Sequence, residues 1–316
     1  MKSRTLQFGL CAFVLWHLAA AMQAQVPKGH QQQQKIRLRK HAGTIDIEVN
    51  GKPFTTYHFA DDFLYPAVRP YFWPVLASDG VEVTIDQAQH KELRPSQRSI
   101  WIGAGDVNGA DHWKFKAIPL PKQRHVRFVW IRHNGFQEKL IWEDKTAQPM
   151  LEEIRTVLFH ATPDGVRGIE FDLRFKPIAG NVTFANASDN GLLSIRPIPS
   201  IANHPQFTAD DGGANCEKHS AWCDESGEID GQIYGMAMFD APSNPRHPPL
   251  WHAHADARLA TDIFATPEYG KGDPRRKTGD LTIRMGATAT FRYEILIHKD
   301  TAKAAHISDK YVEFRR

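Results

Sequence analysis

The stretch Thr44-Ile45-Asp46-Ile47-Glu48-Val49-Asn50-Gly51 decides the fold class of this chain. Apolar and polar residues alternate along it, as they do in a strand with one buried face, and the closing Asn-Gly pair is a strong hairpin signal. The alternation resumes at Phe54-Thr55-Thr56-Tyr57-His58-Phe59, which is therefore expected to be the returning strand.

The same alternation recurs at 81–85, 126–131, 168–175, 281–285 and 291–298. Helical periodicity is confined to a short stretch around 302–307. Many short strands separated by Gly and Pro predict an all-β protein, and a large two-sheet antiparallel β-sandwich suits the length better than an immunoglobulin-like domain. Because no linker or fixed repeat interrupts residues 41–316, we expect a single β-sandwich domain there.

Residues 1–24 have the composition of a secretory signal peptide. Lys2 and Arg4 precede an apolar run from Leu6 to Met22, which is short for a membrane anchor. We expect cleavage near Gln25, followed over residues 25–40 by a polar N-terminal arm that is either a solvated linker or the start of an edge strand. The mature protein is expected to be secreted or periplasmic, with no membrane insertion after signal cleavage.

The formal net charge of +3 is spread along the chain, with basic and acidic residues interspersed. Nucleic acid is therefore not an expected partner. Two cysteines remain after signal removal, Cys216 and Cys223, and an oxidising compartment favours a disulfide between them. A metal site that includes His219 is the alternative, but the spacing fits no common zinc pattern. We expect no metal and no other cofactor.

Two irregular segments concentrate side chains that bind polar small molecules: Gly105-Asp106-Val107-Asn108-Gly109-Ala110-Asp111-His112-Trp113 and Asn244-Pro245-Arg246-His247-Pro248-Pro249-Leu250-Trp251-His252-Ala253-His254. Ordinary solvated turns are the alternative, because Asn-Gly and Asn-Pro are common turn signals. If 251–254 is a strand, His252 and His254 point to the same face. The candidate ligand-binding residues are Asn108, Asp111, His112, Trp113, Trp251 and His254.

The candidate catalytic residues are His252 as acid or base, Arg246 or Arg98 as the cation that stabilises a developing oxyanion, and Asp106 as the orienting carboxylate. Tryptophan rings would serve as platforms for a pyranose. Of Trp101, Trp113 and Trp251, we expect Trp101 to be the most buried because it alternates with Ile100 and Ile102.

Four segments together, 69–75, 98–113, 221–227 and 244–252, resemble the DUF6807 family, which also carries the label PmoA-like or methane oxygenase. The resemblance runs from about Gly43 to Phe314. It implies an exported β-sandwich related to the galactose-mutarotase-like supersandwich, in bacteria that degrade complex carbohydrates. A methane oxygenase subunit is a membrane protein, and this chain offers no spanning segment after the signal, so that activity is not expected.

The chain is a divergent member. Where the family has His-Pro-His-His-Arg, this sequence has Arg94-Pro95-Ser96-Gln97-Arg98, so three histidines are missing. The family's Trp-His-x-Arg is Trp251-His252-Ala253-His254 here, and its Asp-Phe-Trp is Asp111-His112-Trp113. If those histidines did the family's chemistry, this protein has lost it or rebuilt it from His112 and His254.

Two functions follow as hypotheses. The first is an enzyme that moves a proton on a sugar or uronic acid, by mutarotation, epimerisation or β-elimination; the second is a non-catalytic carbohydrate-binding or accessory protein that kept the ligand site. Either way the expected partner is a carbohydrate or small polar ligand. The sequence shows no Gly-x-Ser-x-Gly nucleophile motif and no phosphate-binding glycine loop. The most informative structural observation for choosing between the two hypotheses is whether His252, Asp106 and Arg98 converge on one concave face.

Overall fold

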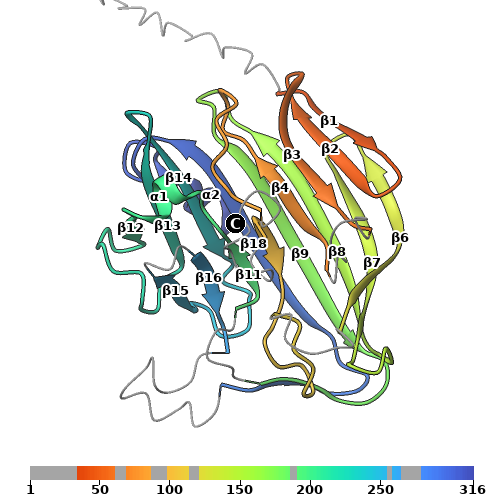
Figure 1. The fold of residues 1–316 in the computed structure, drawn as a ribbon. Helices are drawn as coiled ribbons and strands as arrows, with labels where there is room; N and C mark the ends of the chain where they lie inside the picture. The colour runs from red at the N-terminus through yellow and green to blue at the C-terminus, as the bar shows by residue number, and fades with distance from the viewer. Residues whose placement is uncertain are drawn as a thin grey trace, which may run out of the picture. The chain divides into compact units, whose positions relative to one another are not determined.

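A computed structural model describes residues 34–60, 69–86, 98–113, 121–185, 191–254, 258–264 and 279–316. The predicted signal peptide lies outside these ranges. Most strands belong to two eight-stranded antiparallel sheets that pack face to face (Figure 1). The chain therefore has the all-β, two-sheet architecture that its sequence predicts. Among the described residues, no helix is both long and apolar enough to cross a membrane.

The first sheet combines the N-terminal hairpin with segments from later in the chain, in the order β1-β2-β3-β4-β5-β11-β16-β15. The predicted hairpin is present, since Asn50 and Gly51 have φ values of 53° and 77°, as a type I′ turn requires. The strands are β1 (Ile36–Lys40), β2 (Thr44–Val49), β3 (Lys52–His58), β4 (Tyr71–Val75), β5 (Ile100–Ile102), β11 (Leu193–Ile195), β15 (Leu250–His254) and β16 (Arg258–Asp262).

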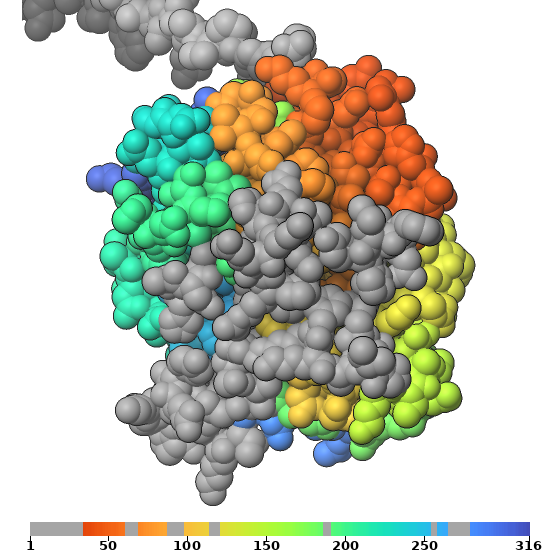
Figure 2. Space-filling model, in the orientation of Figure 1, coloured from red at the N-terminus to blue at the C-terminus, as the bar shows by residue number. Residues whose placement is uncertain are grey.

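Part of the polar N-terminal segment joins this sheet. Strand β1 pairs along β2 in antiparallel register and forms the edge of the sheet. Of the two alternatives for the N-terminal arm, residues 36–40 therefore form an edge strand. Residues 25–33 lie outside the described ranges. In the space-filling view, the β1–β2 hairpin lies at one side of the visible surface, and the region of β12 (Gln206–Ala209) and β13 (Trp222–Ile229) lies at the opposite side (Figure 2).

The second sheet has the order β12-β13-β14-β18-β9-β8-β7-β6. Strands β6, β9 and β18 contain the stretches expected at 126–131, 168–175 and 291–298, respectively. Strand β17 covers the first three residues of the stretch expected at 281–285. The strands are β6 (Gln123–Arg132), β7 (Gly135–Glu143), β8 (Pro149–Ala161), β9 (Arg167–Pro177), β12 (Gln206–Ala209), β13 (Trp222–Ile229), β14 (Gln232–Asp240) and β18 (Ala289–Lys299), and a separate ribbon pairs β10 (Val182–Phe184) with β17 (Leu281–Ile283).

Alternation along the strands places one apolar face of each sheet against the other. The rings of Tyr57 and Phe136 lie 4.7 Å apart between centroids, and Phe72 meets Phe171 edge-on at 5.8 Å. A salt-bridged network crosses this core. Arg155 donates from Nε to Glu153 at 2.7 Å and from Nη1 to the Tyr57 hydroxyl at 3.1 Å. Because these buried groups have partners, the network is compatible with an apolar core.

Two expectations differ from the structure. The stretch 81–85 forms isolated bridges rather than a strand, because it pairs first with residues 75–77 and then with residues 196–198. The helix expected at 302–307 is instead α2 (Ile307–Phe314), which packs its Tyr311 and Phe314 on the outer side of β14. His306 has φ of 55°, so the helix cannot continue back through it. A second short helix, α1, spans Pro199–Ala202.

Cys216 and Cys223 form a disulfide with Cα atoms 6.0 Å apart. Both residues are buried in the main core. The predicted pairing is confirmed, and it fixes the loop that leads into β13.

Candidate functional site

A row of side chains crosses the outer face of the first sheet, by which we mean the face that points away from the second sheet. Ile100 and Ile102 point into the core between the sheets, so Trp101 points outward. The pairing of neighbouring strands places the other residues of the row beside Trp101, on the same face of the sheet. The row, strand by strand from β3, is His58, Tyr71, Trp101, Ser194, Ala260 and His252.

The centre of this row is aromatic. The rings of Trp101 and Trp113 lie 5.3 Å apart, and each residue is 1% exposed. Trp113 comes from the loop after β5 and lies against Gly103 and Gly191, where an added Cβ would stand 3.5 Å and 3.3 Å from its ring atoms. The two glycines therefore make the room in which Trp113 lies against the sheet.

Two buried arginines lie on the Tyr71 side of the row. Arg98 donates from Nε and Nη2 to both carboxylate oxygens of Asp86 at 2.8 Å, and its Nη2 also donates to the Tyr71 hydroxyl at 2.7 Å. Arg69 donates from Nη1 to the His112 carbonyl at 2.6 Å. Burial and the nearby Arg98 lower the pKa of Arg69 to about 9, so it keeps its charge at neutral pH.

A third arginine, Arg258 at the start of β16, lies over the Trp113 ring with its guanidinium carbon 5.4 Å from the centroid. It is 2% exposed, and its Nε and Nη1 have no hydrogen-bond partner among the described residues. The same holds for three further buried atoms, Trp101 Nε1, Ser194 Oγ and Asp262 Oδ1. Each buried polar atom without a partner costs about 1 to 3 kcal/mol, so this cluster on one face indicates a position for a bound ligand or ordered water.

His252 lies at the end of the row on β15. Its Nε2 is 3.1 Å from Oδ2 of Asp262, and the two side chains are 2% and 4% exposed. This separation is an ion-pair distance. An imidazole is a group that can accept a proton from a bound molecule and return it.

Asp106 and Asn108 bind backbone groups of their own loop and its neighbour. Asp106 Oδ1 accepts from the Gly109 amide, three residues on, at 2.7 Å, a contact that closes the turn at 106–109. Asn108 has φ of 52° and bridges to β10, accepting from the Thr183 amide at 2.8 Å and donating to the Asn181 carbonyl at 3.0 Å. These contacts match the turn interpretation of the first segment.

The second segment is also held by backbone contacts. Arg246 donates to the carbonyls of Ile263, at 2.6 Å, and of Asp280 and Gly279. Trp251 points into the core between the sheets, and its Nε1 donates to the Ser220 carbonyl at 2.8 Å. Trp251 is therefore on the opposite side of the sheet from its neighbour His252.

Three predicted residues remain. Asp111 and His112 directly precede Trp113 in the sequence, and His254 pairs with Arg258 in the strand register. Asp111 Oδ1 accepts from the Trp113 amide at 2.8 Å. His112 is buried 4.8 Å from the Trp142 ring, and burial together with Arg69 lowers its pKa to about 3, so it is uncharged near neutral pH. His254 stands opposite Arg258 at the end of β15, and its side chain lies outside the described part of the structure.

The structure thus brings His252, Trp101, Trp113 and Arg98 to one face of the first sheet and leaves Asp106 and Arg246 in turns. Even on that face His252 and Arg98 lie at opposite ends, since Tyr71, on which Arg98 stacks, is four strands from His252, or about 19 Å at a strand spacing of about 4.8 Å. Within the described ranges, no three His, Cys, Asp or Glu side chains gather as metal ligands would.

Sequence reasoning missed four residues of this face: Arg69, Ser194, Arg258 and Asp262. A signal was present for two of them. Arg258-Leu259-Ala260-Thr261-Asp262 has polar ends on one face of a strand, and a strand after 250–254 would pair with it. Ser194 gave no local signal, because its neighbours in space come from strands far away in sequence.

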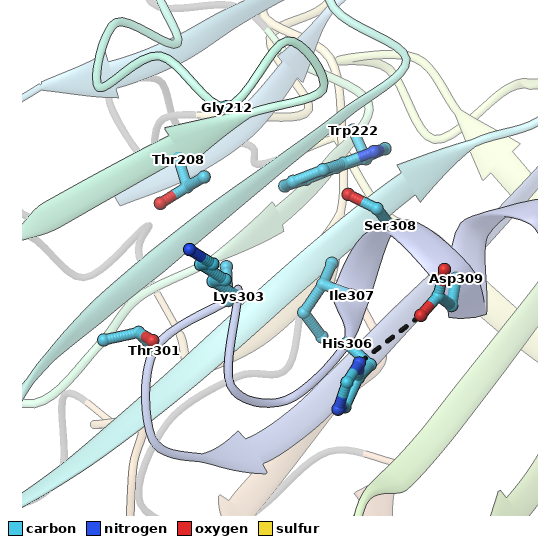
Figure 3. Close-up of a pocket in the computed structure, with 10 residues that line it drawn as sticks. Thr208, Gly212, Trp222, Thr301, Lys303, His306, Ile307, Ser308 and Asp309 are labelled. Atoms are coloured by element: carbon cyan, nitrogen blue, oxygen red, sulfur yellow. Dashed lines mark ion pairs between the residues drawn. The ribbon is translucent and has the colours of Figure 1, made fainter.

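A separate cavity of about 360 Å³ lies on the outer side of the second sheet (Figure 3). It is lined by Trp222 of β13, by the chain before α2, which includes Lys303, and by the first turn of α2, which includes Ser308. An ion pair between His306 and Asp309, at 3.4 Å, also lies there. Both members of that ion pair are mostly exposed, and none of the predicted site residues reaches this cavity.

The sequence of residues 44–311 matches the family described as "Family of unknown function (DUF6807)". The chain belongs to this family. The match spans every strand of the outer-face row, from β3 to β15, and so includes His252 and Arg258. No curated protein matches this DUF6807 member.

Solved structures show a distant likeness to this DUF6807 protein. The GalM/aldose epimerase homologue from C. elegans has 8% identity and a TM-score of 0.34, with 84% of this chain and 99% of that chain covered. The protein HI1317 has 9% identity and a TM-score of 0.28, with 84% and 100% covered.

Proposed function

We propose that the outer face of the first sheet binds a carbohydrate and that the His252–Asp262 pair transfers a proton on the bound sugar. The observation that carries the proposal is the cluster of buried polar atoms without partners beside Trp101 and Trp113. Aromatic rings next to hydroxyl, indole and guanidinium donors have the chemistry that binds a pyranose, whose C–H faces stack and whose hydroxyls form hydrogen bonds.

The proton transfer rests on His252. An imidazole can both accept and donate a proton, and the carboxylate of Asp262 lies 3.1 Å from its Nε2. Epimerisation or mutarotation then needs no external reactant, because the proton taken from one position is returned to the same sugar. A cation near the developing oxyanion would lower the barrier further, and Arg258 is on the same face.

A non-catalytic binding protein is the second candidate, and a specific observation favours it. His112 is uncharged, Arg246 donates to backbone carbonyls, and Arg98 donates to Asp86 and Tyr71, so few of the predicted site residues are available for chemistry. Such a protein would use the same face for binding alone. In either case the signal-like residues 1–24 and the disulfide support export from the cytoplasm.

The two candidates separate in one experiment. Wild type, His252→Gln and Asp262→Asn are incubated with aldoses, uronic acids and 3-keto-glycosides, and NMR follows new anomeric or olefinic signals while titration gives affinity. An enzyme loses about a hundredfold or more in turnover in both variants with affinity within a few-fold. A binding protein shows no turnover, and Trp113→Ala costs it about 1 to 2 kcal/mol of affinity.

His298→Gln is the matched control, because it removes another buried His–Asp pair, His298 with Asp224, on the second sheet. It should lower stability without changing turnover. If no sugar binds at millimolar concentration to the wild type, both candidates are wrong.

A further inference from the structure

We infer that the sugar bound on the outer face carries an anionic group, a carboxylate or a sulfate ester, and that Arg258 holds it. This inference rests on the proposed function and names its substrate class. It starts from the charge of one residue. Arg258 is 2% exposed, its guanidinium group is a cation, and no described carboxylate lies within 4 Å of it.

The other charged groups of the face already have partners. Asp86 accepts from Arg98 through both oxygens, and Asp111 accepts from the Trp113 amide. Asp262 lies beside His252, at the opposite end of β16 from Arg258, about 13 Å away along the strand. Among the residues that the structure describes, no acidic side chain therefore pairs with Arg258.

Stacking on Trp113 does not replace that counter-charge. A cation over an aromatic face gains attraction from the ring, but the Nε and Nη1 hydrogens still have no acceptor. An isolated buried charge is strongly unfavourable, and paired charge-assisted hydrogen bonds to an oxyanion are the arrangement that guanidinium favours. An anion on the ligand satisfies both requirements.

The position also suits a ligand that reaches His252. His252 stands opposite Ala260, and Ala260 is two residues from Arg258, or about 7 Å along the strand. One pyranose ring with its acidic substituent spans such a separation, so the anionic group on Arg258 would leave the ring carbons beside the His252–Asp262 pair. Trp113 then lies under the ring near its charged end.

The test compares three matched probes on the full chain: D-galactose, D-galacturonate and D-galactose 6-sulfate, together with the corresponding glucose series. Calorimetric titration should give wild-type affinity at least about tenfold higher for an anionic sugar than for its neutral counterpart. Arg258→Gln should reduce that preference to within about twofold. Arg132→Gln, which removes an arginine stacked on Trp130 at the exposed edge strand β6, should keep it.

Each outcome has a distinct meaning. A preference for the carboxylate or for the sulfate identifies which anion Arg258 holds. Equal affinity for neutral and anionic sugars overturns this inference and leaves the proposed function intact, whereas failure of every sugar to bind overturns the proposed function itself.

Stability gives a second readout that does not depend on binding. Without sugar, Arg258→Met should not lower Tm, because it removes a buried charge that has no partner. A large fall in Tm would mean that the fold already supplies an anion to Arg258, and the inference would then be wrong.

Discussion

Replacing Gly103 by alanine should displace Trp113 from the outer face of the first sheet. Gly103 follows β5 directly and has no positive φ, so alanine is allowed by its backbone. The added Cβ, however, would stand 2.8 Å from the His112 carbonyl oxygen and 3.2 Å from Arg69 Nη1. These two atoms are hydrogen-bonded to each other at 2.6 Å, so the clash falls on the contact that holds the His112–Trp113 segment in place.

The expected cost follows from that geometry. A backbone oxygen held by a buried guanidinium cannot swing aside as a flexible side chain can, and overpacking of this kind costs about 1 to 3 kcal/mol. For a chain of this length that corresponds to a fall in Tm of roughly 2 to 6 °C. Ligand affinity should fall as well, because Trp113 supports both Trp101 and Arg258.

Calorimetric Tm and sugar titration of Gly103→Ala measure both effects. Gly43→Ala is the matched control, since its added Cβ would meet only the Cβ of Ala60, at 3.3 Å, and should change Tm by less than about 1 °C. If Gly103→Ala has the Tm and affinity of the wild type, the His112–Trp113 segment does not lie on Gly103 and our account of the site is wrong.

Three further predictions concern stability. Burial opposes the charge on His298, but Asp224 at 2.7 Å outweighs it and raises the pKa of His298 above its usual 6.5. The pair should therefore stabilise the fold fully below pH 6.5 and lose that contribution as pH rises through the raised pKa; Tm of His298→Gln measured from pH 5 to 9 should lack this fall. Protein purified from an oxidising compartment should show no free thiol after denaturation, and the Cys216→Ser, Cys223→Ser double variant should lose about 2 kcal/mol because the closed loop is short. Exhaustive treatment with a chelator should leave Tm and sugar binding unchanged, and a fall of several degrees that zinc or calcium restores would contradict this.

The strands were predictable because their information is local. Alternation over 44–49, the Asn50-Gly51 turn and the return at 54–59 gave β2, the hairpin and β3 without reference to any distant residue. The stretch 81–85 has the same alternation but does not form a strand, because its hydrogen-bond partner changes after two residues. Whether an alternating stretch becomes a strand depends on a partner that its own sequence does not specify.

The site was harder to predict because its residues meet through strand order. Ser194 lies between Trp101 and Ala260 only because β11 pairs with both β5 and β16, an arrangement that no spacing along the chain indicates. His252 was predicted from its own sequence segment, whereas Asp262, its partner, belongs to the next strand. Polar residues in turns were predicted to take part in catalysis, Asp106 among them, but the Asp106 carboxylate binds a backbone amide of its own turn.

Parity along a strand explains why the tryptophans divide as they do. Trp101 alternates with Ile100 and Ile102, and because those isoleucines fill the core, the same alternation that predicts its burial places it on the opposite, outer side of the sheet. Trp251 and His252 are neighbours on β15, so they must point to opposite faces, with Trp251 in the core and His252 on the outer face. In this Trp-His dipeptide, the indole packs in the core between the two sheets and fixes the strand, and the imidazole is thereby held on the outer face of the first sheet. Of the three tryptophans, the two that stand beside the buried polar atoms are Trp101 and Trp113, and Trp113 reaches them from a loop because two glycines leave it room.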